Sequence, residues 1–307
     1  MKPLLVLVGP TAVGKTVLSL ELAEVLDGEI VSADSRQVYV GMDIGTAKAT
    51  AEERQRIPHH LLDIKQPDEA ISLGEYLDLA NAAIDDIHRR GRLPLLVGGT
   101  GQYVAAVVEG WQVPEVPARP ELRAEFEALA AAEGKEAVYA RLVEVDADSA
   151  ARIDPRNLRR VIRALEVTLA AGKPFSELRA KRPPPYRIAQ IGLTRPRPTL
   201  YERADARIEH MFAAGFVAEV ERLLATGCTP DLSSFGSLGY REVAGYLAGE
   251  YHLEVAQDLL RRHTRQFIRR QYNWFSLGNP AIAWFDLEER TPQDVLAHAR
   301  QVWSEHV

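Results

Sequence analysis

A phosphate-binding pattern stands near the start of this sequence. Residues 9–16 match G-x-x-x-x-G-K-[ST], the pattern of a loop whose backbone N–H groups surround phosphate oxygens. An apolar run precedes the loop at 4–8 and a segment with helical spacing follows at 17–26, so a helix N-terminus faces the ligand. In such a loop the Lys15 ammonium neutralises phosphate oxygens and the Thr16 hydroxyl binds Mg²⁺. The pattern predicts a diphosphate site with magnesium; a glycine-rich turn without a ligand is the alternative.

A second group of polar residues, 32–48, follows a short buried run of strand character. Ligands of open α/β sheets bind at the carboxyl ends of the strands, and this segment lies at the carboxyl end of a strand beside the phosphate loop. Asp34 is placed like a general base, and Arg36, Gln37 and Lys48 are placed like binding groups. For Asp34 alone, an Asx turn that caps the loop is the alternative.

Two shorter motifs carry polar groups that could reach a ligand. Residues 98–103, GGTGQY, end another apolar run, and Thr100 is the hydroxyl placed to touch a ligand, unless the motif is a plain glycine turn. The segment 58–63 holds His59, His60 and Asp63, which could suggest a metal site. Because adjacent histidines usually point in opposite directions, a hydrogen-bonded structural role is favoured over metal binding.

The elements that position these motifs alternate between strand and helix over 1–110, which predicts a parallel sheet covered on both faces. A proline-rich stretch, 113–120, is expected to be a linker. The segments that follow have helical character at 120–133, 136–145 and 157–171, strand character at 187–193, and mostly helical character over 199–275. The simplest organisation is one α/β domain, 1–112 and 187–307, that carries a helical insertion at 113–186.

Composition limits the class of protein. The chain has 307 residues, 46% of them hydrophobic and 26% charged, which excludes a disordered or collagen-like chain. The single cysteine, Cys228, excludes a disulfide framework or a zinc finger and favours the cytosol. The first apolar run is interrupted by residue 9, so neither a signal peptide nor a transmembrane helix is expected.

Basic residues cluster although the formal net charge is -6. Residues 151–200 carry twelve Arg or Lys and three Asp or Glu. A second cluster has no acid between its ends and consists of Arg261, Arg262, Arg265, Arg269 and Arg270. Such clusters on an acidic protein are typical of a surface that binds a polyanion. The alternative is a solvated helix face whose long side chains cover apolar surface.

The motifs together resemble those of the tRNA dimethylallyltransferase family. Besides 9–16, the resemblance rests on DSRQVYVGMDIGTAK at 34–48, PHHLLDI at 58–64, GGTGQY at 98–103, RRVIRALEV at 159–167, IGLTRPR at 191–197 and SLGYRE at 237–242. It implies transfer of a dimethylallyl group from its diphosphate to the exocyclic N6 amine of the adenosine 3′ of the anticodon, with Mg²⁺. It also implies a phosphate-loop NTPase-like α/β core with a helical insertion domain that grips the anticodon arm of tRNA.

The resemblance also implies roles for individual residues. Asp34 would be the general base, Thr100 would lie where adenine and diphosphate meet, Arg207 would pair with the diphosphate beside Lys15, and Thr16 would bind Mg²⁺. The diphosphate loop would comprise Gly9, Pro10, Thr11, Ala12, Val13, Gly14, Lys15 and Thr16. The tRNA contacts would comprise Asp34, Ser35, Arg36, Gln37, Thr100, Arg123, Arg159, Arg160, Val161, Ile162 and Arg163.

Two other functions stay open on the residues alone. A phosphate-loop kinase would bind ATP and phosphorylate a nucleoside or small metabolite, although no clear apolar strand ends in the aspartate that such an enzyme needs. A non-catalytic RNA-binding protein could carry a vestigial loop, although Gly14, Lys15, Thr16 and Asp34 are all present. We expect a cytosolic monomer whose partners are tRNA and dimethylallyl diphosphate, without a membrane.

Overall fold

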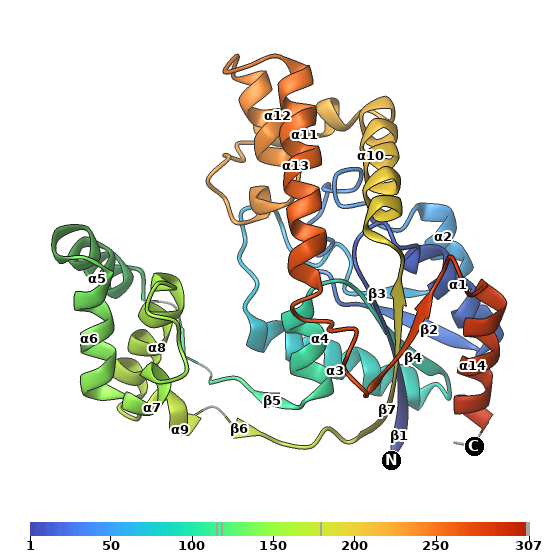
Figure 1. The fold of residues 1–307 in the computed structure, drawn as a ribbon, viewed down its shortest axis with the longest axis horizontal. Helices are drawn as coiled ribbons and strands as arrows, with labels where there is room; N and C mark the ends of the chain where they lie inside the picture. Colours follow the sequence, from blue (N-terminus) through green and yellow to red (C-terminus); the bar gives the residue numbers. More distant parts are fainter. Residues whose placement is uncertain (115, 118, 179, 305–307) are drawn as a thin grey trace. The chain divides into compact units, whose positions relative to one another are not determined.

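A computed structural model describes residues 1–114, 116, 117, 119–178 and 180–304 (Figure 1). Two compact units are formed, the first by Met1–Val108 and Pro184–Val307 and the second by Glu109–Pro183. The second unit begins four residues before the predicted start of the insertion at 113 and ends three residues before its predicted end at 186. The shift arises because two short strands, β5 (Trp111–Gln112) and β6 (Ala180–Lys181), pair antiparallel within the second unit. Strands of two residues are too short to show an alternating pattern, so the sequence does not indicate them.

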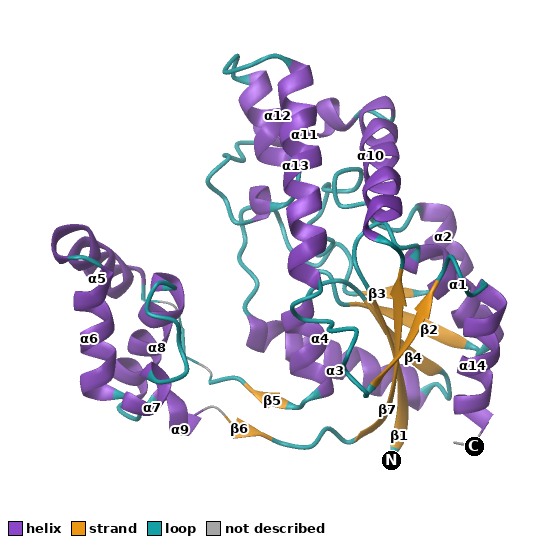
Figure 2. Cartoon of the chain, viewed as in Figure 1, coloured by secondary structure: helices purple, strands orange, loops and turns teal. Residues whose placement is uncertain are grey.

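A six-stranded parallel sheet forms the centre of the first unit (Figure 2). Its order is β3 (His59–His60), β2 (Gly28–Ser32), β4 (Leu93–Val97), β1 (Lys2–Val8), β7 (Tyr186–Thr194) and β8 (Ile282–Asp286). The predicted parallel α/β core is therefore confirmed, and its strands are apolar because both faces are covered. The carboxyl ends of β1, β2, β4 and β7 are followed by the predicted diphosphate loop, the 32–48 segment, the GGTG loop and the TRPR motif.

Helices cover both faces of this sheet. Leu5 and Leu7 of β1 share one buried cluster with Leu18 of α1 (Lys15–Val25) and Val295 of α14 (Pro292–Ser304). On the other face, α3 (Leu73–Arg89) packs on β2 and β4 and contacts α4 (Gly101–Val108). Alternate residues of each strand point to opposite faces, so each strand contributes to both layers.

A helical cluster belongs to the same unit and covers the 34–48 segment. It consists of α10 (Arg197–Ala213), α11 (Phe216–Ala225), the 3₁₀ turn Ser234–Gly236, α12 (Tyr240–Leu247) and α13 (Leu253–Gln271). This agrees with the helical character predicted over 199–275. Val38 and Met42 of the otherwise irregular segment are fully buried in one apolar cluster with Phe216, Tyr240 and Leu260. Apart from the short helix α2 (Ala51–Arg56), the chain between β2 and β3 is held mainly by these tertiary contacts.

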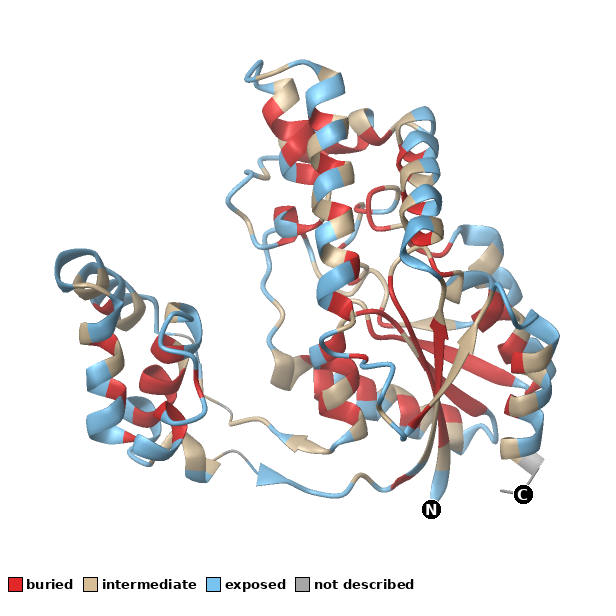
Figure 3. Ribbon diagram, in the orientation of Figure 1, coloured by how far each residue is buried: buried red, intermediate tan, exposed pale blue. Residues whose placement is uncertain are grey.

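The second unit is a small helical bundle with its own core. Its helices are α5 (Pro120–Glu133), α6 (Lys135–Val145), α7 (Ala147–Ala150), α8 (Leu158–Ala171) and α9 (Phe175–Leu178). The bounds of α5, α6 and α8 lie within one residue of the three helices predicted here, whereas the four-residue helices α7 and α9 were not predicted. Phe126, Val138, Leu142, Val161 and Leu165 form the interior. Figure 3 shows the buried stretches of these helices in red. Within the described part of the chain, none of the helices combines the length and apolar composition that a membrane crossing requires.

Candidate functional site

The phosphate loop connects β1 to α1 and closes around the Lys15 side chain. The ammonium of Lys15 donates to the carbonyl oxygens of Gly9 and Pro10, both at 2.9 Å. Burial lowers the pKa of Lys15 to about 8; the carboxylate of Asp34 opposes this shift and the guanidinium of Arg207 reinforces it. The loop therefore holds the Lys15 ammonium in place, and a bound anion would attract this ammonium.

Three arginines from the chain after β7 reach the same loop. They are Arg207, which donates to Thr11 Oγ1 at 3.3 Å, Arg203, which donates to Ala12 O at 2.9 Å, and Arg195, which donates to Val13 O at 3.4 Å. The sequence singled out only Arg207 as a diphosphate ligand. Burial lowers the pKa of Arg207, and the negative charge of Asp34 opposes that effect. The cations surrounding this loop suit a ligand with several negative charges.

A pocket adjoins the loop, with Thr11 and Arg207 in its wall. The rest of the wall is mainly apolar and includes Ile208, Met211 and Leu260. A site with a cationic end and an apolar wall fits an amphiphilic ligand, such as a diphosphate with a short hydrocarbon group.

The predicted base and the predicted channel residue meet at the ends of neighbouring strands β2 and β4. The backbone N–H of Ser35 donates to Thr100 Oγ1 at 3.0 Å, and the N–H of Thr100 donates to Ala33 O at 3.1 Å. The N–H of Arg36 donates to Asp34 Oδ1 at 2.9 Å. Asp34 therefore does form the Asx-type turn considered above, which holds one carboxylate oxygen and fixes the direction of the other. Its charge acts on Lys15, so the candidate base lies beside the diphosphate loop.

Arg36 and Gln37, predicted to contact RNA, also bind within the protein. Arg36 Nη1 donates to Ser233 O at 2.7 Å. Gln37 Nε2 donates to the carbonyl oxygens of Thr46 and Ala47 at 3.3 and 3.2 Å. These bonds fold the 34–48 segment back on itself, and RNA contact by either residue stays a prediction.

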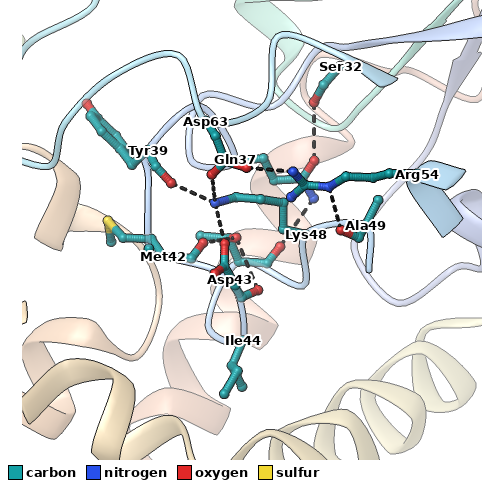
Figure 4. A network of polar contacts seen from close by, with 12 residues as sticks. Ser32, Gln37, Tyr39, Met42, Asp43, Ile44, Lys48, Ala49, Arg54 and Asp63 are labelled. Carbon is teal, nitrogen blue, oxygen red and sulfur yellow. Dashed lines mark hydrogen bonds and ion pairs between the residues drawn. The ribbon is translucent and has the colours of Figure 1, made fainter. Parts of the chain in front are cut away.

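Lys48 is not a ligand-binding group, contrary to the prediction. Its ammonium is fully buried and lies 2.6 Å from Asp43 Oδ1, Asp63 Oδ1 and Tyr39 O, while Arg54 pairs with the second Asp63 oxygen at 2.6 Å (Figure 4). Burial alone would raise the pKa of Asp63, but the hydrogen bonds from Lys48 and Arg54 outweigh it, and the pKa is lowered. Lys48 has all three ammonium donors engaged, so its role is to hold the segment that carries Asp34.

The two histidines make the structural hydrogen bonds that the sequence favoured. His59 Nδ1 lies 2.8 Å from Ile57 O, and His60 Nε2 lies 2.7 Å from Glu29 Oε2. His60 of the edge strand β3 and Arg90 both pair with the buried carboxylate of Glu29, which belongs to the neighbouring strand β2. Both imidazoles serve the packing of that edge.

A buried carboxylate that the sequence analysis missed supports the wall of the pocket. Glu219 of α11 accepts hydrogen bonds from the backbone N–H groups of Asp43, Ile44 and Gly45 at 3.0, 2.8 and 3.2 Å. The hydroxyl of Tyr240 donates to the same carboxylate at 2.7 Å. Gly45 lines the pocket, so Glu219 sets the backbone position of that wall. The motifs 34–48 and 237–242 contain its partners, but neither contains Glu219.

Gln271, the last residue of α13, was likewise missed and lies between two ligand loops. Its Oε1 accepts the backbone N–H of Thr11 at 2.8 Å, and its Nε2 donates to Gly99 O at 3.0 Å. Thr11 was expected to present this N–H to the diphosphate. Instead its N–H is engaged by Gln271, and its hydroxyl faces Arg207.

Part of the predicted RNA-contacting segment of the second unit is engaged inside that unit. Arg123 and Arg163 both pair with the fully buried carboxylate of Glu166, at 2.9 and 2.5 Å. Burial would raise the pKa of Glu166, but hydrogen bonds from these arginines lower it to about 2. Val161 and Ile162 are 0% and 4% exposed, so the prediction that they contact RNA is wrong for their side chains. Helical periodicity turns them into the core while their neighbours face solvent.

Exposed cations remain on both units. Arg159 and Arg160, predicted RNA contacts in α8, are exposed, whereas Arg179 lies outside the described residues. Two arginines of the α13 cluster pair with acids. Arg261 pairs with Asp258 of α13 at 2.9 Å and with Glu209 of α10 at 3.7 Å, and Arg265 pairs with Asp205 of α10. The exposed members of that cluster are Arg262, Arg269 and Arg270.

Comparison with known proteins gives one consistent result. The family model described as IPP transferase matches residues 37–277. The tRNA dimethylallyltransferase of Roseiflexus sp. (strain RS-1) is 58% identical over 275 residues, 90% of each protein. The tRNA dimethylallyltransferase of Thermomicrobium roseum is 46% identical over 288 residues, which are 94% of this chain and 87% of that protein.

Solved structures agree with these relatives. The full-length tRNA isopentenylpyrophosphate transferase from Bacillus halodurans is 41% identical, with a TM-score of 0.73 over 99% of this chain and 96% of that one. A eukaryotic dimethylallyltransferase, described as acting on tRNA, is 26% identical, with a TM-score of 0.84 over 99% of this chain and 80% of that one. Both similarities extend over the diphosphate loop, the Asp34 segment and the second unit, because they cover nearly the entire chain.

Proposed function

This chain belongs to the IPP transferase family, and we propose that it transfers a dimethylallyl group from dimethylallyl diphosphate to tRNA. The acceptor is the N6 amine of the adenosine 3′ of the anticodon, and diphosphate is released. The observation that carries the proposal is the meeting of two sites. Lys15 of the diphosphate loop and Arg207 of α10 lie within electrostatic reach of Asp34, and the two neighbours of Asp34, Ala33 and Ser35, are hydrogen-bonded to Thr100.

The diphosphate side stabilises the leaving group. As the bond from the allylic carbon to oxygen breaks, its electron pair moves to the diphosphate, and positive charge develops on the prenyl group. Lys15 and Arg207 would face the growing negative charge, and preorganised charges of this kind are usually the largest contribution to catalysis. The apolar wall of the pocket, including Ile208 and Met211, shields the prenyl group from water.

Magnesium fits this site through one protein ligand. Thr16 is exposed in the first turn of α1, directly after Lys15, and its hydroxyl makes no hydrogen bond to the residues described. Mg²⁺ usually retains waters and binds substrate phosphates, so a single hydroxyl beside the diphosphate is a sufficient protein contribution. When bound, the ion would supply further charge neutralisation at the diphosphate oxygens.

The acceptor side removes a proton. The N6 lone pair forms the new bond to the allylic carbon, and the nitrogen gives one proton to Asp34. Asp34 Oδ1 is held by the N–H of Arg36, which leaves Oδ2 to receive it. Base assistance of this kind typically raises a rate by about 10²- to 10⁴-fold. Because Asp34 and Thr100 are half-buried, the adenine must leave the anticodon-loop stack to reach them.

A single assay tests the reaction and its position. The purified protein is incubated with Mg²⁺, dimethylallyl diphosphate and an unmodified anticodon stem-loop, and the RNA is weighed by mass spectrometry. A gain of one C5H8 unit is expected, and it is lost when the adenosine 3′ of the anticodon is replaced by guanosine. Phosphoryl transfer from ATP without prenylation would establish the kinase instead, and RNA binding without diphosphate release would establish a binding protein.

The same proposal describes a monomeric cytosolic enzyme. One chain contributes both the diphosphate loop and the acceptor loop, which is the GGTG loop at 98–101, and Gln271 of the same chain bonds to both; this supports a monomer. The single cysteine fits a reducing compartment, where tRNA maturation supplies the substrate. Light scattering of the purified protein should give the mass of one chain.

A further inference from the structure

The buried amide of Gln271 is the direct link between the diphosphate loop and the acceptor loop. Gln271 is 4% exposed and ends α13, which reaches the loop after β4 from above in Figure 1. Both functional groups of its side chain are used, the oxygen on the N–H of Thr11 and the nitrogen on the carbonyl of Gly99. These partners lie 260 and 172 positions away in the sequence, so the link is purely tertiary.

The acceptor loop is shaped to admit this side chain. A Cβ atom built on Gly99 would lie 2.4 Å from Gln271 Nε2, and one built on Gly101 would lie 2.1 Å from Trp274 Cγ. A side chain at residue 99 would displace the amide of Gln271 from Gly99 O, and one at residue 101 would displace Trp274. Contact with Gln271 and Trp274 therefore explains Gly99 and Gly101, in addition to any approach of a ligand, whereas Gly98 packs against the backbone of Ala33.

The link continues from Gly99 to the candidate base. Thr100 follows Gly99 directly, its N–H donates to Ala33 O at 3.1 Å, and its Oγ1 accepts the N–H of Ser35 at 3.0 Å. Asp34 lies between those two residues. A run of hydrogen bonds thus joins the loop expected to hold the leaving group to the residue expected to accept the proton.

We propose that Gln271 is a positioning residue that sets the separation between the diphosphate and the acceptor amine. The inference rests on the proposed function. In-line attack requires the nitrogen about 3–3.5 Å from the carbon that it attacks, and a displacement of about 1 Å can cost about 10²-fold in rate. The amide of Gln271 accepts from Thr11 and donates to Gly99 at once, whereas a carboxylate at this position would lack the donor and an ammonium would lack the acceptor.

The test compares two changes of the same kind on one helix. Gln271→Glu retains the acceptor for Thr11 but places a carboxylate oxygen against Gly99 O. Gln266→Glu, at an exposed position of α13, makes the same chemical change away from both loops. We expect Gln271→Glu to lower kcat by about 10- to 100-fold, because the reacting groups are misplaced, and Gln266→Glu to leave kcat unchanged.

Binding measurements separate positioning from a merely structural role. Calorimetry of the uncharged variant Gln271→Met, with pyrophosphate alone and with the stem-loop alone, should give dissociation constants within about threefold of the wild-type values, because each loop stays intact and no charge is added beside the diphosphate. An unchanged kcat would overturn the inference, as would equal losses in kcat, both affinities and thermal stability. Should Gln271→Glu fail to fold, Gln271→Met is judged by the same criteria, and failure of both variants to fold would assign Gln271 to folding instead. If the wild-type protein transfers no prenyl group, the proposed function itself has failed.

Discussion

Replacing Lys48 by methionine is expected to destabilise the first unit and loosen the segment that carries Asp34. The buried ammonium makes contacts at 2.6 Å with Asp43, Asp63 and the carbonyl of Tyr39. Removing one member of a buried ion pair costs about 3–5 kcal/mol when the other is left without a partner. Here the loss is smaller, because the side chain of Asp43 is 54% exposed and can be rehydrated, and Asp63 keeps Arg54.

The remaining cost comes mainly from the buried carbonyl of Tyr39 and the lost charge-assisted bond to Asp63. An unsatisfied buried carbonyl costs about 1–3 kcal/mol and a hydrogen bond to a charged group contributes about 1.5–3 kcal/mol. Relaxation of the loop recovers part of this sum, so we expect a destabilisation of about 2–4 kcal/mol at pH 7. Urea denaturation followed by circular dichroism measures it, with Lys2→Met as the control, whose ammonium is exposed and 3.8 Å from Asp85.

The pH dependence provides a second, independent check. The folded-state pKa of Asp63 is lowered, so its stabilising contribution is present above the unfolded value of about 3.9 and is lost as pH falls through the folded value. The stability difference between wild type and Lys48→Met should therefore be full near pH 7 and shrink below about pH 4. A variant within about 0.5 kcal/mol of wild type at pH 7, like an ordinary surface substitution, would refute the reasoning. A difference that persisted unchanged at pH 3 would refute the assignment to Asp63.

Three further outcomes are expected. Asp34→Ala should lower turnover by about 10²- to 10⁴-fold and leave the stem-loop dissociation constant nearly unchanged; equal losses in both would remove Asp34 as the base. Replacing Arg159 and Arg160 together by glutamine should reduce the slope of log affinity for RNA against log salt concentration by about 1.4, the value for two single-strand phosphate contacts. Arg123→Gln should chiefly lower the thermal stability of the second unit. An unaltered RNA affinity in the double variant would show that α8 is not an RNA contact. Because burial lowers the pKa of Lys15 to about 8, its ammonium is present below that pH and lost above it. The pyrophosphate affinity of the apoprotein should therefore fall as pH rises from 7 to 9, and the affinity of Lys15→Arg should fall less. Identical pH profiles for the two proteins would contradict the assignment of Lys15 to the diphosphate site.

The local pattern of residues was sufficient to predict the frame of this protein. The phosphate loop depends on a contiguous run of eight residues, and the strand and helix around it depend on apolar periodicity that can be seen in single segments. The helices of the second unit were predicted for the same reason, and α5 begins and ends at the predicted residues 120 and 133. Because parallel strands place their carboxyl ends at one edge, Asp34 and Thr100 could be expected to meet before their contact through Ser35 was known.

The partner of each polar side chain was decided only by the tertiary structure. Lys48 looked like a binding group in a polar loop, yet folding buries its ammonium among carboxylates that lie 5 and 15 positions away. Glu219 and Gln271 belong to segments that read as ordinary amphipathic helix, and their roles depend on loops more than 170 positions away. A periodic pattern reports which face of an element is buried, whereas a hydrogen bond at about 3 Å depends on how distant elements are docked, and no local pattern contains that information.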